Sequence, residues 1–238
     1  ALQERLLSLG YTRERIYFHI SDEPSADHLE SYQAAKAQVT DLLKGWTVID
    51  ALSDYDFYEK GLVERPVPAN NHIQPFADHH VKDLWTYYCC SQNYEVPNRF
   101  FSMPSARNRI MGVLMYLYHI KGFLHWGFNF YNSRLSKEHI DPFLDTHAGY
   151  AFPSGDSFLV YPGTEGEAWS SIRGEVQLEG LYDYRALEAL EALSDRETVE
   201  ELIYEGQSRP FTFTGYPKNA SYLYELRRKI GRKIKELS

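Results

Sequence analysis

Apolar residues recur with two different spacings in the first fifth of the chain. Leucines at near-helical spacing precede Gly10, and a compact apolar run over 16–20 follows, which predicts a helix and then a short buried strand. A second helix is expected over 26–44, ending at Gly45, and the run 46–52 predicts another strand. The order helix, strand, helix, strand favours parallel strands and an α/β fold.

The same alternation continues toward the C-terminus. A Pro-interrupted strand is expected over 63–71, a clearer one over 84–90, a helix over 107–121 and a further strand over 123–129. Residues 131–155 show no period and predict a long functional loop. A short strand over 157–161 and helices over 170–193, 195–205 and 222–237 complete the chain, which we interpret as one domain.

Composition narrows the possible partners. The chain has 238 residues with 19 Tyr and 13 Phe, and its formal net charge of −8 disfavours a nucleic-acid partner. No apolar run reaches the roughly 20 residues that span a bilayer, so no membrane partner is expected. The first residues look like the middle of a helix, so we expect a fragment of a longer chain and infer no compartment.

Two adjacent carboxylates follow the first predicted strand. Strand alternation would place Tyr17, His19, Ser21 and Glu23 on one face, and Pro24 favours an extended backbone at Glu23. The carboxyl ends of strands are where sites form in α/β folds, so Glu23 is a candidate proton donor with Asp22 as its charged neighbour. The alternative is that these acids only favour the N-terminus of the next helix.

Aromatic residues gather near predicted strand ends. Sugar rings present apolar faces that stack on such side chains, while Asn129, Asn132 and Asp141 offer hydrogen bonds to hydroxyls. Ordinary core packing is the alternative for any single ring. The aromatic residues concerned are Trp85, Tyr87, Trp126, Phe128, Tyr131, Tyr150 and Tyr161.

Other site chemistry has little support in the sequence. His72, His79 and His80 lack a placed carboxylate, so no metal site is expected. Adjacent Cys89 and Cys90 have no identifiable catalytic partner and are poorly placed to bridge each other. Neither a G-x-G-x-x-G motif nor a phosphate-binding loop occurs, so no cofactor is expected.

Four ordered motifs resemble the catalytic domain of family 123 glycoside hydrolases and the related domain of unknown function 4091. The resemblance covers most of the chain. The motifs are His19-Ile20-Ser21-Asp22-Glu23-Pro24, then Leu84-Trp85-Thr86-Tyr87-Tyr88-Cys89-Cys90 with Pro97-Asn98-Arg99-Phe100, then Gly122-Phe123-Leu124-His125-Trp126-Gly127-Phe128-Asn129, and finally Ser171-Ile172-Arg173-Gly174-Glu175 with Gly180, Asp183 and Tyr184.

This resemblance implies a (β/α)8 TIM-barrel fold whose fourth strand ends in the Asp-Glu pair. Residues 1–238 would then be a single domain holding about strands 4–8 of the barrel plus C-terminal helices. It also implies cleavage of terminal β-linked N-acetylgalactosamine by a retaining, substrate-assisted mechanism. Glu23 would be the general acid/base and Asp22 would orient the acetamido group, without metal or cofactor, while Trp85, Tyr87, Trp126 and Asn129 would line the sugar pocket.

The sequence is also compatible with an assembled barrel and with two alternative functions. A partial barrel exposes strand edges, so a second copy of the chain or a preceding segment is expected to cover it. A non-catalytic carbohydrate-binding barrel is the first alternative function. A glycosidase with another glycan substrate, or with the conventional two-carboxylate chemistry, is the second.

Overall fold

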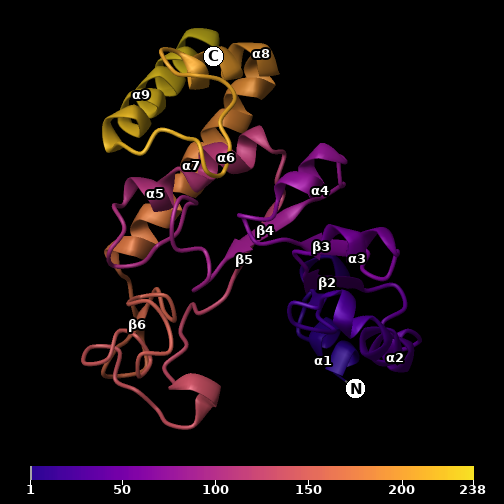
Figure 1. Ribbon diagram of the computed structural model, residues 1–238. Helices are drawn as coiled ribbons and strands as arrows, with labels where there is room; N and C mark the ends of the chain where they lie inside the picture. The colour runs from indigo at the N-terminus through magenta and orange to yellow at the C-terminus, as the bar shows by residue number, and fades with distance from the viewer. Residues whose placement is uncertain (1) are drawn as a thin grey trace. The chain divides into compact units, whose positions relative to one another are not determined.

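The computed structural model describes residues 2–238 and contains two compact units (Figure 1). The N-terminal unit is the chain up to Tyr87 together with Lys121–Leu124. The C-terminal unit comprises Tyr88–Ile120 and His125–Ser238.

Parallel strands form the centre of the N-terminal unit. Strands β1 (Tyr17–Phe18), β2 (Thr47–Ala51) and β3 (Arg65–Val67) pair in that order, and both pairings are parallel. A parallel bridge between Ala69 and Tyr87 links the segment after β3 to β4 (Trp85–Tyr88), which pairs with β5 (Gly122–His125). The helices of this unit are α1 (Leu2–Ser8), η1 (Arg13–Arg15), η2 (Ala26–His28), α2 (Leu29–Val39), α3 (Tyr55–Glu59) and α4 (Gln74–Asp78).

A small apolar cluster holds α2 and α3 against the end of β2. Tyr32 of α2 and Phe57 of α3 meet edge to face, with ring centroids 5.3 Å apart, beside Leu52 and Val63. Phe57 is placed by the start of α3, where the Asp54 side chain accepts a hydrogen bond from its backbone N–H. The cluster therefore fixes α2 and α3 relative to the end of β2.

One aromatic contact shows that the row of strands is curved. The rings of Tyr17 in β1 and Trp85 in β4 have centroids 4.9 Å apart, although β2 and β3 lie between their strands. Neighbouring strands are about 4.8 Å apart, so side chains three strands apart meet only on a concave face. This concave face carries the candidate site.

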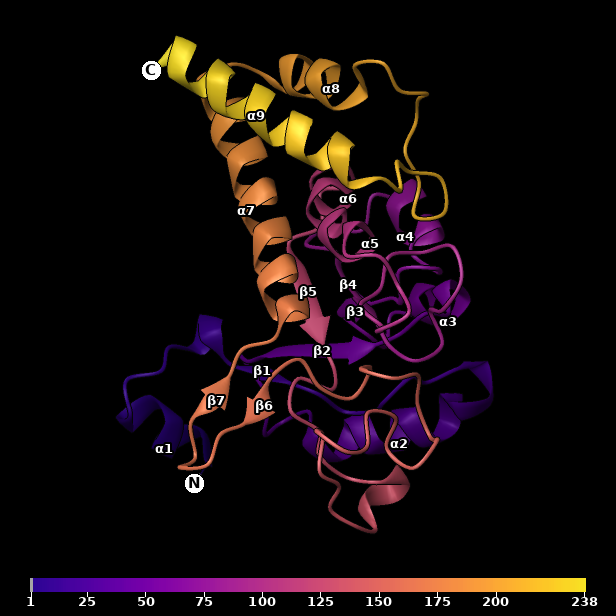
Figure 2. The same ribbon diagram turned by 90° about the vertical axis from the view of Figure 1, so that its left-hand side faces the viewer.

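Helices dominate the C-terminal unit. The long helix α7 (Ile172–Leu193) packs against the others of this unit, and α9 crosses it (Figure 2). The remaining elements are α5 (Ala106–Arg109), α6 (Met111–Leu117), η3 (Arg134–Ser136), α8 (Arg196–Tyr204), α9 (Ala220–Leu237) and the antiparallel pair β6 (Tyr161–Pro162) and β7 (Ala168–Trp169). Within the described residues, no helix has both the length and the apolar character needed to cross a bilayer.

Close helix contact in this unit depends on two glycines. A Cβ at Gly112 would lie 1.8 Å from the Gly180 carbonyl oxygen, and one at Gly180 would lie 2.7 Å from the Arg109 carbonyl oxygen. The buried Asp183 carboxylate accepts two hydrogen bonds from Arg109, at 2.6 and 3.0 Å. The resulting contact joins α5 and α6 to α7.

The observed elements confirm the α/β class and correct several details. The helices expected over 170–193, 195–205 and 222–237 are present within two residues of their expected limits. The strands over 16–20 and 123–129 are shorter than expected, and α3 and α4 were not expected. The strands of residues 2–238 form small sheets, one of them antiparallel, and close no barrel, so the expected partial TIM barrel is not confirmed.

Candidate active site

The carboxylate pair lies in a bend after β1. Asp22 and Glu23 are both exposed, and β1 ends four residues before Asp22. Glu23 has a φ of 46°, in the left-handed region that a non-glycine residue rarely adopts. The extended backbone expected from Pro24 is therefore wrong, and the bend stores local strain of the kind found at functional sites.

Tyr87 is the partner that the structure gives to Glu23. Its hydroxyl donates a short hydrogen bond to the Glu23 carboxylate. Tyr87 is only 5% exposed, and its backbone pairs with the segment after β3, since its N–H donates to Pro68 and its carbonyl accepts from Asn70. A fixed phenol therefore holds a carboxylate that is itself exposed.

A buried carboxylate below the bend explains why β1 is short. Asp50 of β2 accepts hydrogen bonds from the backbone N–H groups of Ile20 and Ser21, at 2.8 and 3.0 Å. These two groups are thus bound to a side chain instead of continuing the β1 ladder. Asp50 is not among the candidates predicted from the sequence, although an acid within the apolar run 48–52 is a usable signal.

Trp85 lies on the same concave face, beside Tyr17. It is half-buried, and its indole lies directly over β5, where a Cβ at Gly122 would come within 2.1 Å of the ring. Glycine is therefore required at position 122 for the indole to take this place. Trp85 and Tyr87 are two residues apart in β4, which puts them on one face of the strand.

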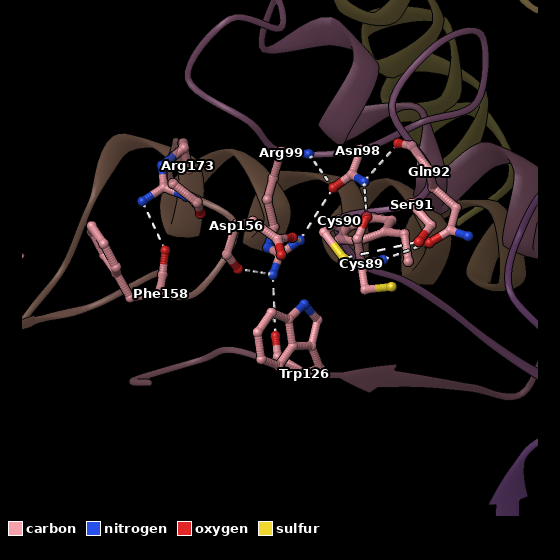
Figure 3. A network of polar contacts seen from close by, with 12 residues as sticks. Cys89, Cys90, Ser91, Gln92, Asn98, Arg99, Trp126, Asp156, Phe158 and Arg173 are labelled. Atoms are coloured by element: carbon pink, nitrogen blue, oxygen red, sulfur yellow. Dashed lines mark hydrogen bonds and ion pairs between the residues drawn. The ribbon is translucent and has the colours of Figure 1, made fainter. Parts of the chain in front are cut away.

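Trp126 and Asn129 belong to the C-terminal unit. A polar network holds Trp126, since its carbonyl accepts a hydrogen bond of 3.1 Å from Arg99 (Figure 3). The Trp126 ring packs against Phe152, with centroids 5.0 Å apart. Asn129 is exposed and forms an isolated antiparallel bridge with Phe158.

The centre of this network is an ion pair without solvent contact. Arg99 and Asp156 both have fully buried side chains, with Arg99 Nη1 3.1 Å from Asp156 Oδ1, and Asn98 accepts a further hydrogen bond from Arg99 (Figure 3). Arg173 donates to the carbonyl of Phe158 at 2.8 Å. The network therefore fixes residues 156–158 and the carbonyl of Trp126 by charged hydrogen bonds.

Burial shifts the titration of several groups in this unit. It lowers the pKa of His125 to about 3, with the Arg99 charge acting in the same direction. It lowers the pKa of Arg173 to about 10. Burial also raises the pKa of Asp156, against the opposing effect of Arg99. His125 is therefore a neutral side chain at physiological pH.

The structure brings together part of the predicted set. Glu23 contacts Tyr87, and Trp85 shares their concave face, while Asp22 is exposed next to Glu23 in the chain. Trp126 and Asn129 lie in the other unit. Among the weaker candidates, His79 stacks on Tyr55 with centroids 4.4 Å apart. The arrangement in the N-terminal unit offers an exposed carboxylate for proton transfer, with aromatic rings on the same face.

Comparison with known proteins places the chain in a family. The family model described as glycoside hydrolase 123, catalytic domain, matches residues 1–190. The fold is similar to that of a family 123 glycoside hydrolase from Clostridium perfringens, with a TM-score of 0.60 at 17% identity, over 99% of this chain and 42% of that one. This chain thus spans less than half the length of that neighbour. Comparison with curated proteins gave no match. The chain belongs to the glycoside hydrolase 123 catalytic-domain family.

Proposed function

We propose that this chain is part of a glycoside hydrolase that cleaves terminal β-linked N-acetylgalactosamine by a retaining, substrate-assisted mechanism. The observation that carries the proposal is the Glu23 carboxylate, held by the Tyr87 hydroxyl in a strained bend beyond a parallel strand. Membership of the glycoside hydrolase 123 family supports the reaction class. The Clostridium perfringens enzyme hydrolyses glycolipid glycans, which supports glycans of this kind as substrates.

In the first step, Glu23 gives its proton to the glycosidic oxygen as the bond to the anomeric carbon breaks. The carbonyl oxygen of the sugar's own acetamido group attacks that carbon and forms an oxazolinium ion. Asp22 accepts a hydrogen bond from the acetamido N–H and stabilises the positive charge that develops there. No covalent bond between enzyme and sugar forms.

In the second step, Glu23 acts as a base. It takes a proton from a water molecule, which attacks the anomeric carbon and reopens the oxazolinium ring with net retention. The Tyr87 hydroxyl keeps the Glu23 carboxylate in one orientation through both steps. Trp85, Trp126 and Asn129 are the further residues predicted to contact the sugar.

The proposal includes the fold of the complete enzyme. Residues 1–238 would form one domain that supplies about strands 4–8 of a (β/α)8 barrel, followed by C-terminal helices. The concave face that brings Tyr17 to Trp85 supports this, because a barrel interior requires such curvature. A further segment or a second copy would cover the open edges.

The test is hydrolysis of aryl β-N-acetylgalactosaminides and the matching glucosaminides by the full-length protein. Glu23→Gln is expected to lower kcat/KM, which reports the first step, by about 10² to 10⁴ with a phenyl leaving group, and by much less with a dinitrophenyl group that departs without a proton. Asp22→Asn should lower kcat with both leaving groups. Glu30→Gln, at an exposed position of α2, is the matched control and should keep the wild-type rate.

Other outcomes identify the alternatives. An unchanged rate in Glu23→Gln would overturn the assignment of the acid. A glycosyl-enzyme trapped by a fluorosugar and seen by mass spectrometry would indicate the conventional two-carboxylate mechanism. Tight inhibition by a thiazoline, the sulfur analogue of the oxazolinium ion, supports substrate assistance. Binding of N-acetylgalactosamine without turnover, retained in Glu23→Gln, would indicate a carbohydrate-binding barrel.

A further inference from the structure

We infer that Asp50 is a positioning residue that sets the path of the acid loop, defined as residues 19–25, and through it the place of Glu23. This inference rests on the proposed function, because it concerns the residue that delivers the proton. Asp50 is itself 0% exposed and lies within β2, so it has no access to a substrate. Its effect on the reaction must therefore pass through the groups that it binds.

Three hydrogen bonds reach the Asp50 carboxylate. Oδ1 accepts from the N–H groups of Ile20 and Ser21, at 2.8 and 3.0 Å, and Oδ2 accepts from the Tyr32 hydroxyl at 2.5 Å. The imidazole of His19 lies 3.5 Å from Oδ1. A carboxylate without solvent contact needs such donors, so its position and that of the loop backbone determine each other.

Tyr32 connects the Asp50 carboxylate to the apolar core. Its side chain is 2% exposed and packs within the cluster of Leu52, Phe57 and Val63. Burial, together with the hydrogen bond to Asp50, raises the pKa of the Tyr32 hydroxyl, so the group keeps its proton and remains a donor. The apolar core thereby fixes Asp50, and Asp50 fixes the backbone at 20 and 21.

The first part of the acid loop and the Glu23 side chain are thus held by different partners. Asp50 holds the backbone at Ile20 and Ser21, and Tyr87 holds the Glu23 side chain. Between them Glu23 has its left-handed φ of 46°, a conformation that persists only where neighbouring contacts enforce it. Loss of the Asp50 contacts would let the loop relax, and displacement of an acid by about 1 Å can cost 10²-fold in rate.

Steady-state kinetics of the full-length protein on aryl N-acetylgalactosaminide test the inference. Asp50→Ala is expected to lower kcat about 100-fold with KM changed less than about 3-fold, because the acid moves while the sugar contacts remain. Asp50→Asn should recover most of the loss, since an amide oxygen can still accept from both N–H groups. Val63→Ala, which loosens the same core without removing a hydrogen bond, should keep kcat within about 2-fold.

A second readout does not depend on activity. Amide hydrogen exchange at Ile20 and Ser21 should quicken at least 10-fold in Asp50→Ala relative to Val63→Ala. Should Asp50→Ala not fold, Tyr32→Phe takes its place, because it removes only the hydroxyl. We expect it to lower kcat and to quicken amide exchange at Ile20 and Ser21, each several-fold. If the wild-type protein hydrolyses no substrate, the proposed function fails, and exchange alone decides the positioning role. Unchanged exchange, or equal kcat losses in Asp50→Ala and Val63→Ala, would overturn the inference.

Discussion

Asp50 in the N-terminal unit and Asp156 in the C-terminal unit both have fully buried side chains, but their partners differ. Asp50 is bound by neutral donors, two backbone N–H groups and a phenol. Asp156 is paired with the guanidinium of Arg99, which also binds Asn98 and the carbonyl of Trp126. One carboxylate therefore directs the path of a short loop, and the other joins distant segments through an ion pair.

The free energy of unfolding that is lost when a partner is removed should differ between these two buried carboxylates. When a guanidinium is lost, the remaining carboxylate is left without its countercharge in a medium of low polarity. When a neutral donor is lost, the remaining donors still satisfy part of the carboxylate. Substitutions of the partners of these two carboxylates test the difference directly, and His125 and Arg196 extend it to a buried imidazole and a partly exposed ion pair.

Arg99→Met should destabilise the protein most, by about 3 to 5 kcal/mol, because it leaves Asp156 buried and unpaired. Urea denaturation followed by far-UV circular dichroism measures the change. The double variant Arg99→Met with Asp156→Asn is the control and should recover part of the loss. A loss below about 1 kcal/mol in the single variant would show that Asp156 finds another partner.

Tyr32→Phe should cost about 2 kcal/mol, because it removes one donor from a charged acceptor that keeps two backbone donors. The same urea titration measures it. A loss as large as that of Arg99→Met would contradict the distinction between neutral and charged partners. Tyr55→Phe, at a ring that packs against Phe76, provides a comparison outside this group of hydrogen bonds.

His125 should make the stability depend on pH. Its pKa is about 3 in the folded protein and 6.5 in the unfolded chain, so the unfolded chain binds the extra proton between these values. Its contribution is complete above pH 6.5 and falls by about 1.4 kcal/mol per pH unit as the pH drops toward 3. His125→Gln should remove this slope between pH 6.5 and 5, measured as the difference from wild type. Parallel curves for the two proteins would refute the burial of a neutral imidazole.

Arg196→Ala should have the smallest effect of the four. Its ion pair with Glu200 is an i,i+4 pair on α8, 2.7 Å long, and both side chains are partly exposed. Such pairs contribute about 0.3 to 0.5 kcal/mol, and salt screens them. The loss should shrink further in 1 M NaCl. A loss above 2 kcal/mol, insensitive to salt, would mean that the contacts of Arg196 with the carbonyls of Tyr116 and Leu117 dominate.

Local patterns predicted some elements well and others poorly. The helices α7, α8 and α9 and the strand β2 follow from sustained periodicity, which local sequence carries. The early end of β1 does not, because it depends on Asp50, which lies 29 residues further along the chain than Ser21. The conformation of Glu23 was mispredicted for the same reason, since tertiary contacts override the preference imposed by Pro24.

The candidate site, like the fold, was predicted only in part. Glu23 and Tyr87 were both predicted as site residues from separate motifs, and the hydrogen bond between them appears only in the structure. Residue patterns alone could not find Asp50, because a buried acid shows its role only through its partners. Trp126 and Asn129 lie in the C-terminal unit, whereas Glu23 and Tyr87 lie in the N-terminal unit. Their place in the pocket therefore stays a prediction.

The curved row of strands also affects how fast the protein folds. The contact between Glu23 and Tyr87 joins residues 64 positions apart, and the contact between Tyr17 and Trp85 spans a similar stretch. Contacts between residues far apart in the sequence slow folding, because a long loop must close first. These contacts are therefore expected to form only after the intervening strands have docked. The change in Trp85 fluorescence should therefore appear in a late kinetic phase during refolding.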